Sequence, residues 1–430
     1  MKTFYGLIDC NNFYASCERV FAPQWEKKPV VVLSNNDGCV IARSKEAKEK
    51  EIPMAVPYFK VEGDLKRHKI QVFSSNYALY GDLSSRVMDV IRSVVPTVEV
   101  YSIDEAFADF SHLPEEELEE KAQLIYERCL KWVGIPVTVG VGTSKTLAKV
   151  AAEYVKKHSK DRNTLVVKTQ TEAELLLKRV AIHKVWGIGR GYTRRLTEAG
   201  ISTAYDFIKY DVDWVKNTMG VIGLRTWYEL QGESCRAVTD VIERRKMIMT
   251  SRSFGKAVTT YSAMKEAIVT YLVRCAEKLR EQGLYASYVT VYIRTFRYQK
   301  YNPQNNASAM HTLTVPTNYT PTLIDAAVKA LNEVFKEGYR YQKAGVLLAG
   351  LLPQKAIQLP LFSESEEYVV DNRSRQQLMA SIDALNHKYG YGKIKYTAEG
   401  VAKNWKMRSG KRSPSYTTDW KDLLQVRIKS

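Results

Sequence analysis

The stretch from Tyr101 to Phe107 constrains the fold of this chain more than any other. Its sequence is Tyr-Ser-Ile-Asp-Glu-Ala-Phe, and apolar runs at 98–101 and 106–110 have the character of short strands. Two such strands so close together predict a β-hairpin, with Asp104 and Glu105 at or near its bend. Adjacent side chains of a straight strand point to opposite faces, so two neighbouring acids can share a ligand only where the chain bends. A shared Mg²⁺ ion, which takes oxygen ligands, would explain the pair; a solvated turn is the alternative.

A third carboxylate, that of Asp9, lies at the end of another predicted strand. Residues 4–8 form a compact apolar run, and from Phe13 onward the apolar residues have helical spacing. Asp9 could simply cap that helix, a position in which Asp is favourable. Alternatively, Asp9 and the acidic pair lie on one sheet and bind two metal ions, which hold the attacking and leaving oxygens of a phosphoryl displacement.

The charge of the chain indicates a polyanionic partner. Its 64 lysines and arginines exceed its 47 acids by 17, and an excess of this size favours nucleic acid. No stretch approaches the roughly 18 apolar residues that suggest a membrane span. The first residues run straight into a strand rather than a signal peptide, so we expect a cytoplasmic protein without membrane contacts. The six cysteines show no Cys-x-x-Cys spacing, which argues against disulfides and zinc sites.

The order of predicted elements divides the 430 residues into several domains. Strands and helices alternate to about residue 167, which predicts one α/β unit that contains all three acids. A helical segment follows over 168–235, and the basic stretch 236–250 is interpreted as a linker. The order βαββαβ over 251–353 then predicts a split, ferredoxin-like unit, and we expect residues 354–430 to form a tail with a short helix at about 374–388.

Two glycine-containing turns have the general appearance of phosphate-binding elements. The run from Val137 to Thr146 looks like the phosphate loop of ATPases, but Val139 and Ser144 stand where that loop needs glycines, so an ATPase is excluded. The second turn, Gly187-Ile188-Gly189-Arg190, precedes a helix and resembles a helix-hairpin-helix, whose N–H groups bind a DNA backbone without reading its bases. An ordinary turn between helices is the alternative, and the arginines beside the turn favour DNA.

Other candidate binding residues lie along the rest of the chain. Lys48 and Lys149 fall on predicted helices and could each hold a phosphate, although a solvated helix face also accounts for Lys48. Arg294 and Arg297 end a strand of the second unit, either to contact a nucleic-acid backbone or to prevent sheet aggregation. The peptide Gln358-Leu359-Pro360-Leu361-Phe362 is interpreted as an exposed anchor for a pocket of another protein, or as a bare linker fragment.

With these motifs in place, the sequence resembles the Y-family DNA polymerases, and within them the UmuC branch, over nearly its whole length. Residues 9–18 and 101–107 are similar to the first and second motifs of the family, which are highly specific together. Residues 34–43, 73–77 and 413–418 are similar to the UmuC branch in particular. The resemblance implies an α+β multidomain fold of the right-hand polymerase type. Its expected parts are a ferredoxin-like palm and small fingers (1–167), a helical thumb with the helix-hairpin-helix near 185–201 (168–235), a linker (236–250), a βαββαβ little finger (251–353) and a C-terminal tail with a clamp-binding peptide (354–430).

The resemblance also implies a catalytic site. Asp9, Asp104 and Glu105 would ligate two Mg²⁺ ions, with the carbonyl of Cys10 as a further ligand. Tyr14 matches the steric gate, whose ring would strike a ribose 2′-OH and so favour deoxynucleotides.

Further roles follow from the resemblance for residues around that site and beyond it. Phe13 accompanies Tyr14 in the nucleotide site, and Lys48 and Lys149 match contacts to the triphosphate. Other branches have Arg at the first of these lysines, and a lysine supplies a point charge rather than a bidentate grip. Residues 358–362 are similar to the family's peptide for the replicative sliding clamp. DNA contacts are expected from Gly187, Gly189, Arg190, Arg294 and Arg297.

The expected function is error-prone, template-directed DNA synthesis past damaged bases, by two-metal nucleotidyl transfer and without proofreading, as part of an SOS-type response. Expected partners are primer-template DNA, deoxynucleoside triphosphates and the sliding clamp, with a UmuD-like subunit and a recombinase filament in addition, at the bacterial nucleoid. One alternative is a DNA-binding accessory subunit without polymerase chemistry, against which the three intact carboxylates argue. Another is a nucleotidyl cyclase, which would need neither the Gly-x-Gly turn nor a net charge of +17.

Overall fold

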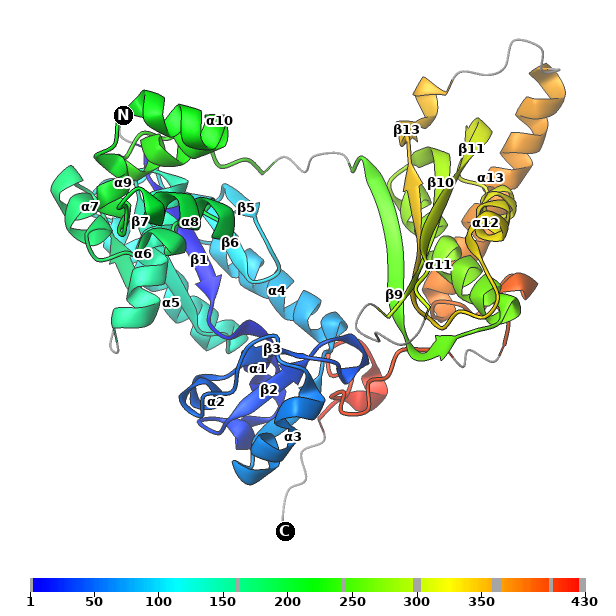
Figure 1. Cartoon of the computed structure of the whole chain (residues 1–430), viewed down its shortest axis with the longest axis horizontal. Coiled ribbons are helices and arrows are strands. Elements are labelled where there is room, and N and C mark those ends of the chain that lie inside the picture. Colours follow the sequence, from blue (N-terminus) through cyan, green and yellow to red (C-terminus); the bar gives the residue numbers. More distant parts are fainter. Residues whose placement is uncertain are drawn as a thin grey trace. The chain divides into compact units, whose positions relative to one another are not determined.

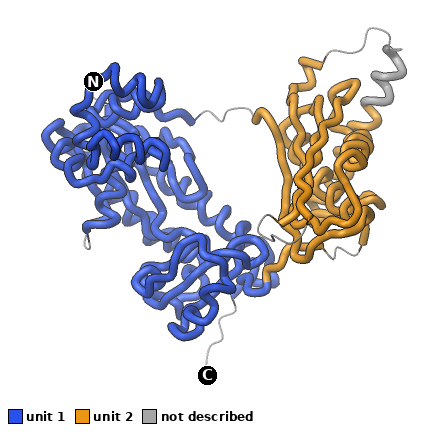
Figure 2. The backbone as a smooth tube through the Cα atoms, viewed as in Figure 1, with its two compact units in different colours: residues 1–242, 410–430 blue, residues 243–409 orange. Residues whose placement is uncertain are grey.

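The computed structural model describes residues 3–159, 162–240, 245–296, 303–357, 365–401 and 405–424, with side chains omitted for 365–372. They form two compact units, one of residues 1–242 and 410–430 and the other of residues 243–409 (Figure 2). The chain therefore leaves the first unit, forms the second and returns to the first. The sequence predicted one continuous C-terminal tail and did not anticipate this return.

A five-stranded sheet forms the centre of the first unit (Figure 1). The first four strands of this sheet along the chain form its ferredoxin-like part, and the first and third of these four lie in the middle, the order expected for a palm. The hairpin predicted around the acidic pair is present, and Glu105 begins its second strand. In spatial order the strands are β5 (Val98–Val100), β6 (Glu105–Asp109), β1 (Tyr5–Cys10), β7 (Val137–Gly142) and β8 (Thr164–Val166).

Helices cover both faces of this sheet because its strands are apolar on both sides. Ile8 belongs to the core formed with α4 (Tyr77–Arg92) and α5 (Leu118–Arg128), whereas Leu7 packs against Ala148 and Ala152 of α6 (Lys145–His158). Such alternation is what the two-residue period of a strand dictates. A Cβ atom at Gly140 would overlap the backbone of α6, so this glycine lets the helix lie directly on β7.

A smaller sheet follows β1 in the chain and has its own core. Its strands, in spatial order, are β3 (Val40–Arg43), β2 (Val30–Leu33) and β4 (Gln71–Ser74). Val31 and Leu33 face α2 (Lys45–Glu49) and α3 (Tyr58–Arg67), and Val32 faces the core shared with α1 (Phe13–Phe21). The side chain of Ser44 accepts from the N–H of Ala47 and caps α2.

The segment from 168 to 235 is helical, as expected. Two capping boxes, Thr169 with Glu172 and Thr203 with Asp206, fix the starts of two of its helices. Gly187 has a φ of 89°, which favours glycine, and it shapes the turn before the helix that begins at Arg190. The helices are α7 (Gln170–Leu177), α8 (Arg190–Glu198), α9 (Ala204–Ile208) and α10 (Val212–Leu230), and η4 (Ile182–Lys184) is a 3₁₀ turn.

The second unit has the predicted element order βαββαβ. It comprises β9 (Met247–Val258), α11 (Tyr261–Glu281), β10 (Leu284–Thr295), β11 (Asn306–Thr317), α12 (Thr320–Val334) and β12 (Tyr341–Ala349), followed by the short β13 (Leu352–Pro353) and by α13 (Ser365–Tyr389). Three details differ from prediction. Because β9 begins at Met247, the predicted linker 236–250 ends too late, and α13 begins well before the helix expected from about 374.

The third difference is the strand order of this sheet, β11-β10-β12-β9. The split β–α–β arrangement is confirmed, because β12 lies between β9 and β10. However, the second and fourth strands of the unit are central, whereas a ferredoxin-like sheet places the first and third there. The sequence pattern shows where strands occur, but not which strands become neighbours. One face of the sheet packs on α11 and α12, while Tyr288 and Arg294 are exposed. None of the helices in the described residues has the length and the apolar character that a membrane crossing requires.

Candidate active site

The end of β1 brings Asp9 beside the acidic pair of the hairpin. Asp9 lies directly opposite Glu105 in the antiparallel pairing of β1 and β6. The N–H of Cys10 donates to the carbonyl of Asp104 at 2.8 Å, so the backbone itself joins the strand end to the bend. The structure therefore places Asp9 beside the acidic pair, which is far from it in sequence, at one edge of one sheet.

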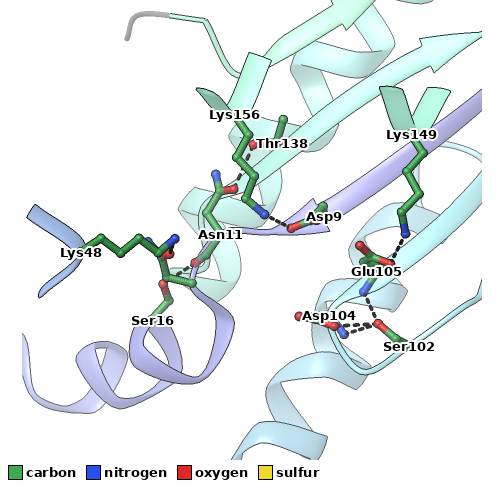
Figure 3. A network of polar contacts seen from close by, with 11 residues as sticks. Asp9, Asn11, Ser16, Lys48, Ser102, Asp104, Glu105, Thr138, Lys149 and Lys156 are labelled. Carbon is green, nitrogen blue, oxygen red and sulfur yellow. Dashed lines mark hydrogen bonds and ion pairs between the residues drawn. The ribbon is translucent and has the colours of Figure 1, made fainter. Parts of the chain in front are cut away.

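Two lysines of one helix neutralise two of these acids. The Nζ of Lys156 is 2.5 Å from Oδ1 of Asp9, and the Nζ of Lys149 is 2.8 Å from Oε2 of Glu105. The two lysines are seven residues apart, which places them on the same face of α6, and Figure 3 shows both reaching down to neighbouring strands. Asp104 has no such ion pair in the described residues; its Oδ1 accepts a hydrogen bond from Ser102 Oγ at 2.6 Å.

Burial of Asp9 makes the negative charge of its carboxylate costly. It raises the pKa of Asp9 to about 6, against the opposing effect of Lys156, and the neighbouring Glu105 raises it further. Asp9 and Glu105 are neighbouring carboxylates that offer only oxygen donors, and such a pair suits a hard divalent cation. Burial also raises the pKa of the Cys10 thiol well above its ordinary value, so the thiol stays protonated and only the carbonyl of Cys10 could serve as a ligand.

The acids are not gathered into a metal-binding cluster in this conformation. Across the part of the chain that the structure describes, no three His, Cys, Asp or Glu side chains are arranged to hold an ion. The expected ligands instead point to Lys149, Lys156 and Ser102 (Figure 3). Their chemistry fits two divalent ions, and assembly of the ligand set requires these side chains to turn.

A cavity of about 350 Å³ opens beside Asp9 and contains most of the predicted nucleotide site. The ring of Tyr14 stacks on that of Tyr80 with centroids 4.4 Å apart, and it meets Tyr77 edge-on at 6.0 Å. This packing fixes the ring at the cavity wall. The predicted residues that line the cavity are Asp9, Cys10, Phe13, Tyr14, Lys48 and Asp104.

Lys48 enters the cavity from α2, which packs on the smaller sheet. Its Nζ donates to Oδ1 of Asn12 at 2.6 Å. Burial lowers the pKa of Lys48, and the neighbouring positive charges of Lys156 and Arg43 lower it further. These three cations lie around one cavity, which therefore offers several positive charges to an anionic ligand.

Lys156 is a residue that the sequence analysis missed. It follows the predicted Lys149 by two helical turns, and this spacing was the signal that could have identified it. The predicted Lys149 itself does not line the cavity; it pairs with Glu105 and lies over the rings of Tyr101 and Trp186.

The remaining predicted site residues lie elsewhere. Gly187, Gly189 and Arg190 form the turn into α8, and Arg294 lies on β10 with its guanidinium 5.4 Å from the ring centre of Tyr292. Arg297 and the peptide 358–362 fall outside the described residues.

The loop that superficially resembles an ATPase phosphate loop has a structural role. Lys145 is buried and its Nζ is 2.6 Å from Oε2 of Glu99. The backbone N–H of Thr146 donates to the buried carboxylate of Glu229 on α10 at 3.1 Å. The contacts of Lys145 and Thr146 therefore fasten the start of α6 to its surroundings, which agrees with the exclusion of an ATPase.

Comparison with known proteins relates this geometry to a family. Residues 8–153 match the impB/mucB/samB family, and residues 245–361 match the C-terminal domain of the same family. Residues 376–426 match a domain of unknown function.

Individual relatives cover almost the entire chain. It is 39% identical to Protein UmuC of Salmonella typhimurium strain LT2, over 98% of this chain and 100% of the relative. It is 40% identical to Protein ImpB of Salmonella typhimurium, over 99% of this chain and 100% of the relative. DNA polymerase IV of Clostridium acetobutylicum is 27% identical over 82% of this chain and 85% of its own length.

A solved structure shows the same fold. A Y-family DNA polymerase chimera of Dbh and Dpo4 superimposes with a TM-score of 0.64 at 22% identity, over 81% of this chain and 99% of that one. The full-length relatives and the family matches together establish membership: the chain belongs to the impB/mucB/samB family and is a Y-family DNA polymerase of the UmuC type.

Proposed function

We propose that the error-prone translesion synthesis of this family is performed here by Asp9, Asp104 and Glu105, which would hold two Mg²⁺ ions. The pairing of Asp9 with Glu105 at the mouth of the Tyr14 cavity carries this proposal. When bound, such ions supply Lewis-acid activation of the primer hydroxyl and neutralise charge on the triphosphate. The carbonyl of Cys10 is a further candidate ligand, and the family's synthesis proceeds without proofreading.

Lys149 and Lys156 would exchange partners when the site is loaded. In the structure each ammonium group neutralises a carboxylate. When those carboxylates turn to a divalent cation, the ammonium groups become available to the triphosphate, whose charge they can stabilise without rearrangement of α6. Lys48 would bind the same phosphates, because it lines the same cavity together with Arg43.

Tyr14 would select the sugar. Its ring lies in the cavity wall between Phe13 and the rings of Tyr77 and Tyr80, which prevent it from swinging away. A ribose 2′-OH that meets a fixed ring is rejected by steric overlap, whereas a deoxyribose fits.

The proposal also includes DNA and protein partners. The Gly187–Arg190 turn would bind the DNA backbone through N–H groups, and Arg294 and Arg297 would contact it from the second unit. Residues 358–362 would bind the replicative sliding clamp. A UmuD-like subunit, a recombinase filament and a place at the bacterial nucleoid in the cytoplasm complete the proposal.

Primer extension opposite an abasic site tests the catalytic assignment. We expect Asp104→Ala, and omission of divalent ions, to abolish extension, while Asp109→Asn retains it. Asp109 is a suitable control because it lies at the far end of the same strand as Glu105. Full extension by Asp104→Ala would overturn the site. Absence of extension by the wild-type chain under all conditions would favour the accessory-subunit alternative.

A further inference from the structure

Residues 410–424, which we call the C-terminal strap, pack on the first unit after the chain has formed the second. The strap is drawn in red in Figure 1. It joins the free edge of β4: the N–H of Ser74 donates to the carbonyl of Lys411 at 2.9 Å, and the N–H of Lys411 donates to Ser74 Oγ at 2.9 Å. The N–H of Gly410 donates to Oδ2 of Asp37 at 3.0 Å. The strap is thus bonded to the smaller sheet through its backbone.

One buried side chain links the strap to helix α4. The Nδ2 of Asn76 donates to Ser413 Oγ at 3.0 Å, to the carbonyl of Ser413 at 3.3 Å and to the carbonyl of Pro414 at 3.2 Å. The Oδ1 of Asn76 accepts from the N–H of Leu79 and caps the helix. Asn76 is only 2% exposed, so these partners replace water. The amide nitrogen of Asn76 therefore binds the strap, while its amide oxygen caps the start of α4.

The first turn of α4 carries the two rings that fix Tyr14. Tyr77 directly follows Asn76, and Tyr80 follows one turn later. Tyr80 stacks on Tyr14 with an interplanar angle of 15°, and Tyr77 meets it at 86°. Any movement of this turn is consequently transmitted to the ring of Tyr14.

The strap also reaches α1, the helix on which Tyr14 lies. Tyr80 Oη donates to Oε1 of the buried Glu18 at 2.6 Å. Burial raises the pKa of Glu18, and hydrogen bonds from the hydroxyls of Tyr80 and Ser413 partly offset this effect. Tyr416 stacks nearly parallel on Phe21, the last residue of α1, with centroids 4.8 Å apart.

We propose that the C-terminal strap is a positioning element for sugar selection, in which Asn76 and Ser413 fix the packing of Tyr14. This inference rests on the proposed role of Tyr14 as the steric gate, and it gives a task to part of the segment that matches a domain of unknown function. Asn76 and Ser413 act through the tyrosines of α4 and are positioning residues, since neither lines the cavity.

The test uses two substitutions in the full-length chain. Asn76→Asp keeps the oxygen that caps α4, and Asp is a good N-cap, but it removes the donor to Ser413 and Pro414. Ser413→Ala removes the hydroxyl and leaves the backbone of the strap intact. Asp211→Ala is the matched control, because it removes the N-cap of α10, a helix that contributes nothing to the cavity. Tyr14→Ala is the positive control.

The readout is the ratio of kcat/KM for a ribonucleotide to that for the matching deoxynucleotide, on an undamaged template. A loss of folded protein lowers both values equally, whereas a displaced gate changes their ratio. We expect Asn76→Asp to raise the ratio by about 3- to 10-fold, since small misplacements in an active site have effects of this order. Ser413→Ala should raise it less, and Asp211→Ala should leave it unchanged.

Three results distinguish the role of the strap from the role of Tyr14. An unchanged ratio in Asn76→Asp and Ser413→Ala, together with a raised ratio in Tyr14→Ala, would overturn the strap's role while preserving the gate. An unchanged ratio in Tyr14→Ala would overturn the gate itself and the inference with it. If Asn76→Asp fails to fold, as judged by near-ultraviolet circular dichroism, Ser413→Ala alone decides the matter.

Discussion

Lys156 and Asp9 form an ion pair at the end of the central strand, with 2.5 Å between Nζ and Oδ1. The carboxylate belongs to a motif that is expected to bind metal, and its partner is a lysine that lines the nucleotide cavity. The side chains of Asp9 and Lys156 are 19% and 30% exposed, so solvent screens the pair only in part. Without metal, Lys156 and Asp9 neutralise each other. Binding of the substrate and its metal would separate these two charges.

Replacement of Lys156 should make the protein more dependent on divalent ions. Lys156→Met keeps the apolar stem but leaves Asp9 without its ion-pair partner, which should cost about 1 kcal/mol of stability. We expect the melting temperature in EDTA to fall by about 2–4 °C, and the rise on adding Mg²⁺ to exceed that of the wild type. Thermal unfolding with and without Mg²⁺ measures both.

The neighbouring Lys157 provides the control for this substitution. It pairs with Glu153 one turn away on the exposed side of α6, at 2.9 Å. Lys157→Met should therefore leave the Mg²⁺-induced shift in melting temperature unchanged. An identical Mg²⁺ response in Lys156→Met and the wild type would show that Lys156 and the ion do not compete for the same carboxylates.

The raised pKa of Asp9 should appear in the pH dependence of stability without metal. Burial raises the pKa of Asp9 from 3.8 to about 6, so the folded state binds this proton more tightly than the unfolded state does. Ionised Asp9 therefore destabilises the folded protein. This effect is absent below about pH 3.8 and complete above about pH 6. In EDTA, the free energy of unfolding of Asp9→Asn should therefore rise relative to wild type as pH increases from about 4 to 7, by about 3 kcal/mol. Urea unfolding at several pH values measures this difference, and a pH-independent difference would contradict it.

Much of the candidate site could be predicted because its signals are local. A strand that ends in Asp9 and a hairpin that carries Asp104 and Glu105 are legible from apolar runs and their boundaries. The exact register that sets Asp9 opposite Glu105 depends on strand pairing, which a one-dimensional pattern does not specify. Lys156 was accessible in principle from its spacing to Lys149, but only once Lys149 was known to face the sheet.

The strap was beyond prediction for a different reason. Asn76 and Ser413 are 337 residues apart in the sequence. No periodic pattern of apolar residues around either of them predicts that they form a buried contact. A polar residue at the start of a helix is adequately explained as a cap. The second function of Asn76, as a donor to a distant segment, emerges only when the chain is folded. The same limit explains why the strand order of the second unit differed from the expected one.

Removal of the Tyr14 ring should admit ribonucleotides. Tyr14→Ala opens the cavity wall where Tyr80 and Tyr77 now hold the ring, so a ribose 2′-OH no longer meets it. We expect incorporation of ribonucleotides to rise by about 10-fold or more, whereas Tyr14→Phe, which keeps the ring, should stay near wild type. Single-nucleotide primer extension with matched ribo- and deoxynucleotides measures this. Equal discrimination by Tyr14→Ala and the wild type would remove Tyr14 from the proposed site.

Two glycines should respond oppositely to alanine, because one lies beneath a helix and the other is on an open surface. A Cβ atom at Gly140 would overlap the backbone of Ala148 and Ala152, so Gly140→Ala must push α6 away from β7. We expect a loss of about 1–3 kcal/mol in stability and reduced synthesis, since α6 also carries Lys149 and Lys156. At Gly81, within α4, a Cβ atom has no neighbour within 4 Å, so Gly81→Ala should gain about 0.5–1 kcal/mol from helix propensity. Urea unfolding followed by circular dichroism compares the two variants, and a Gly140→Ala variant as stable as the wild type would show that close contact between α6 and β7 does not position the lysines.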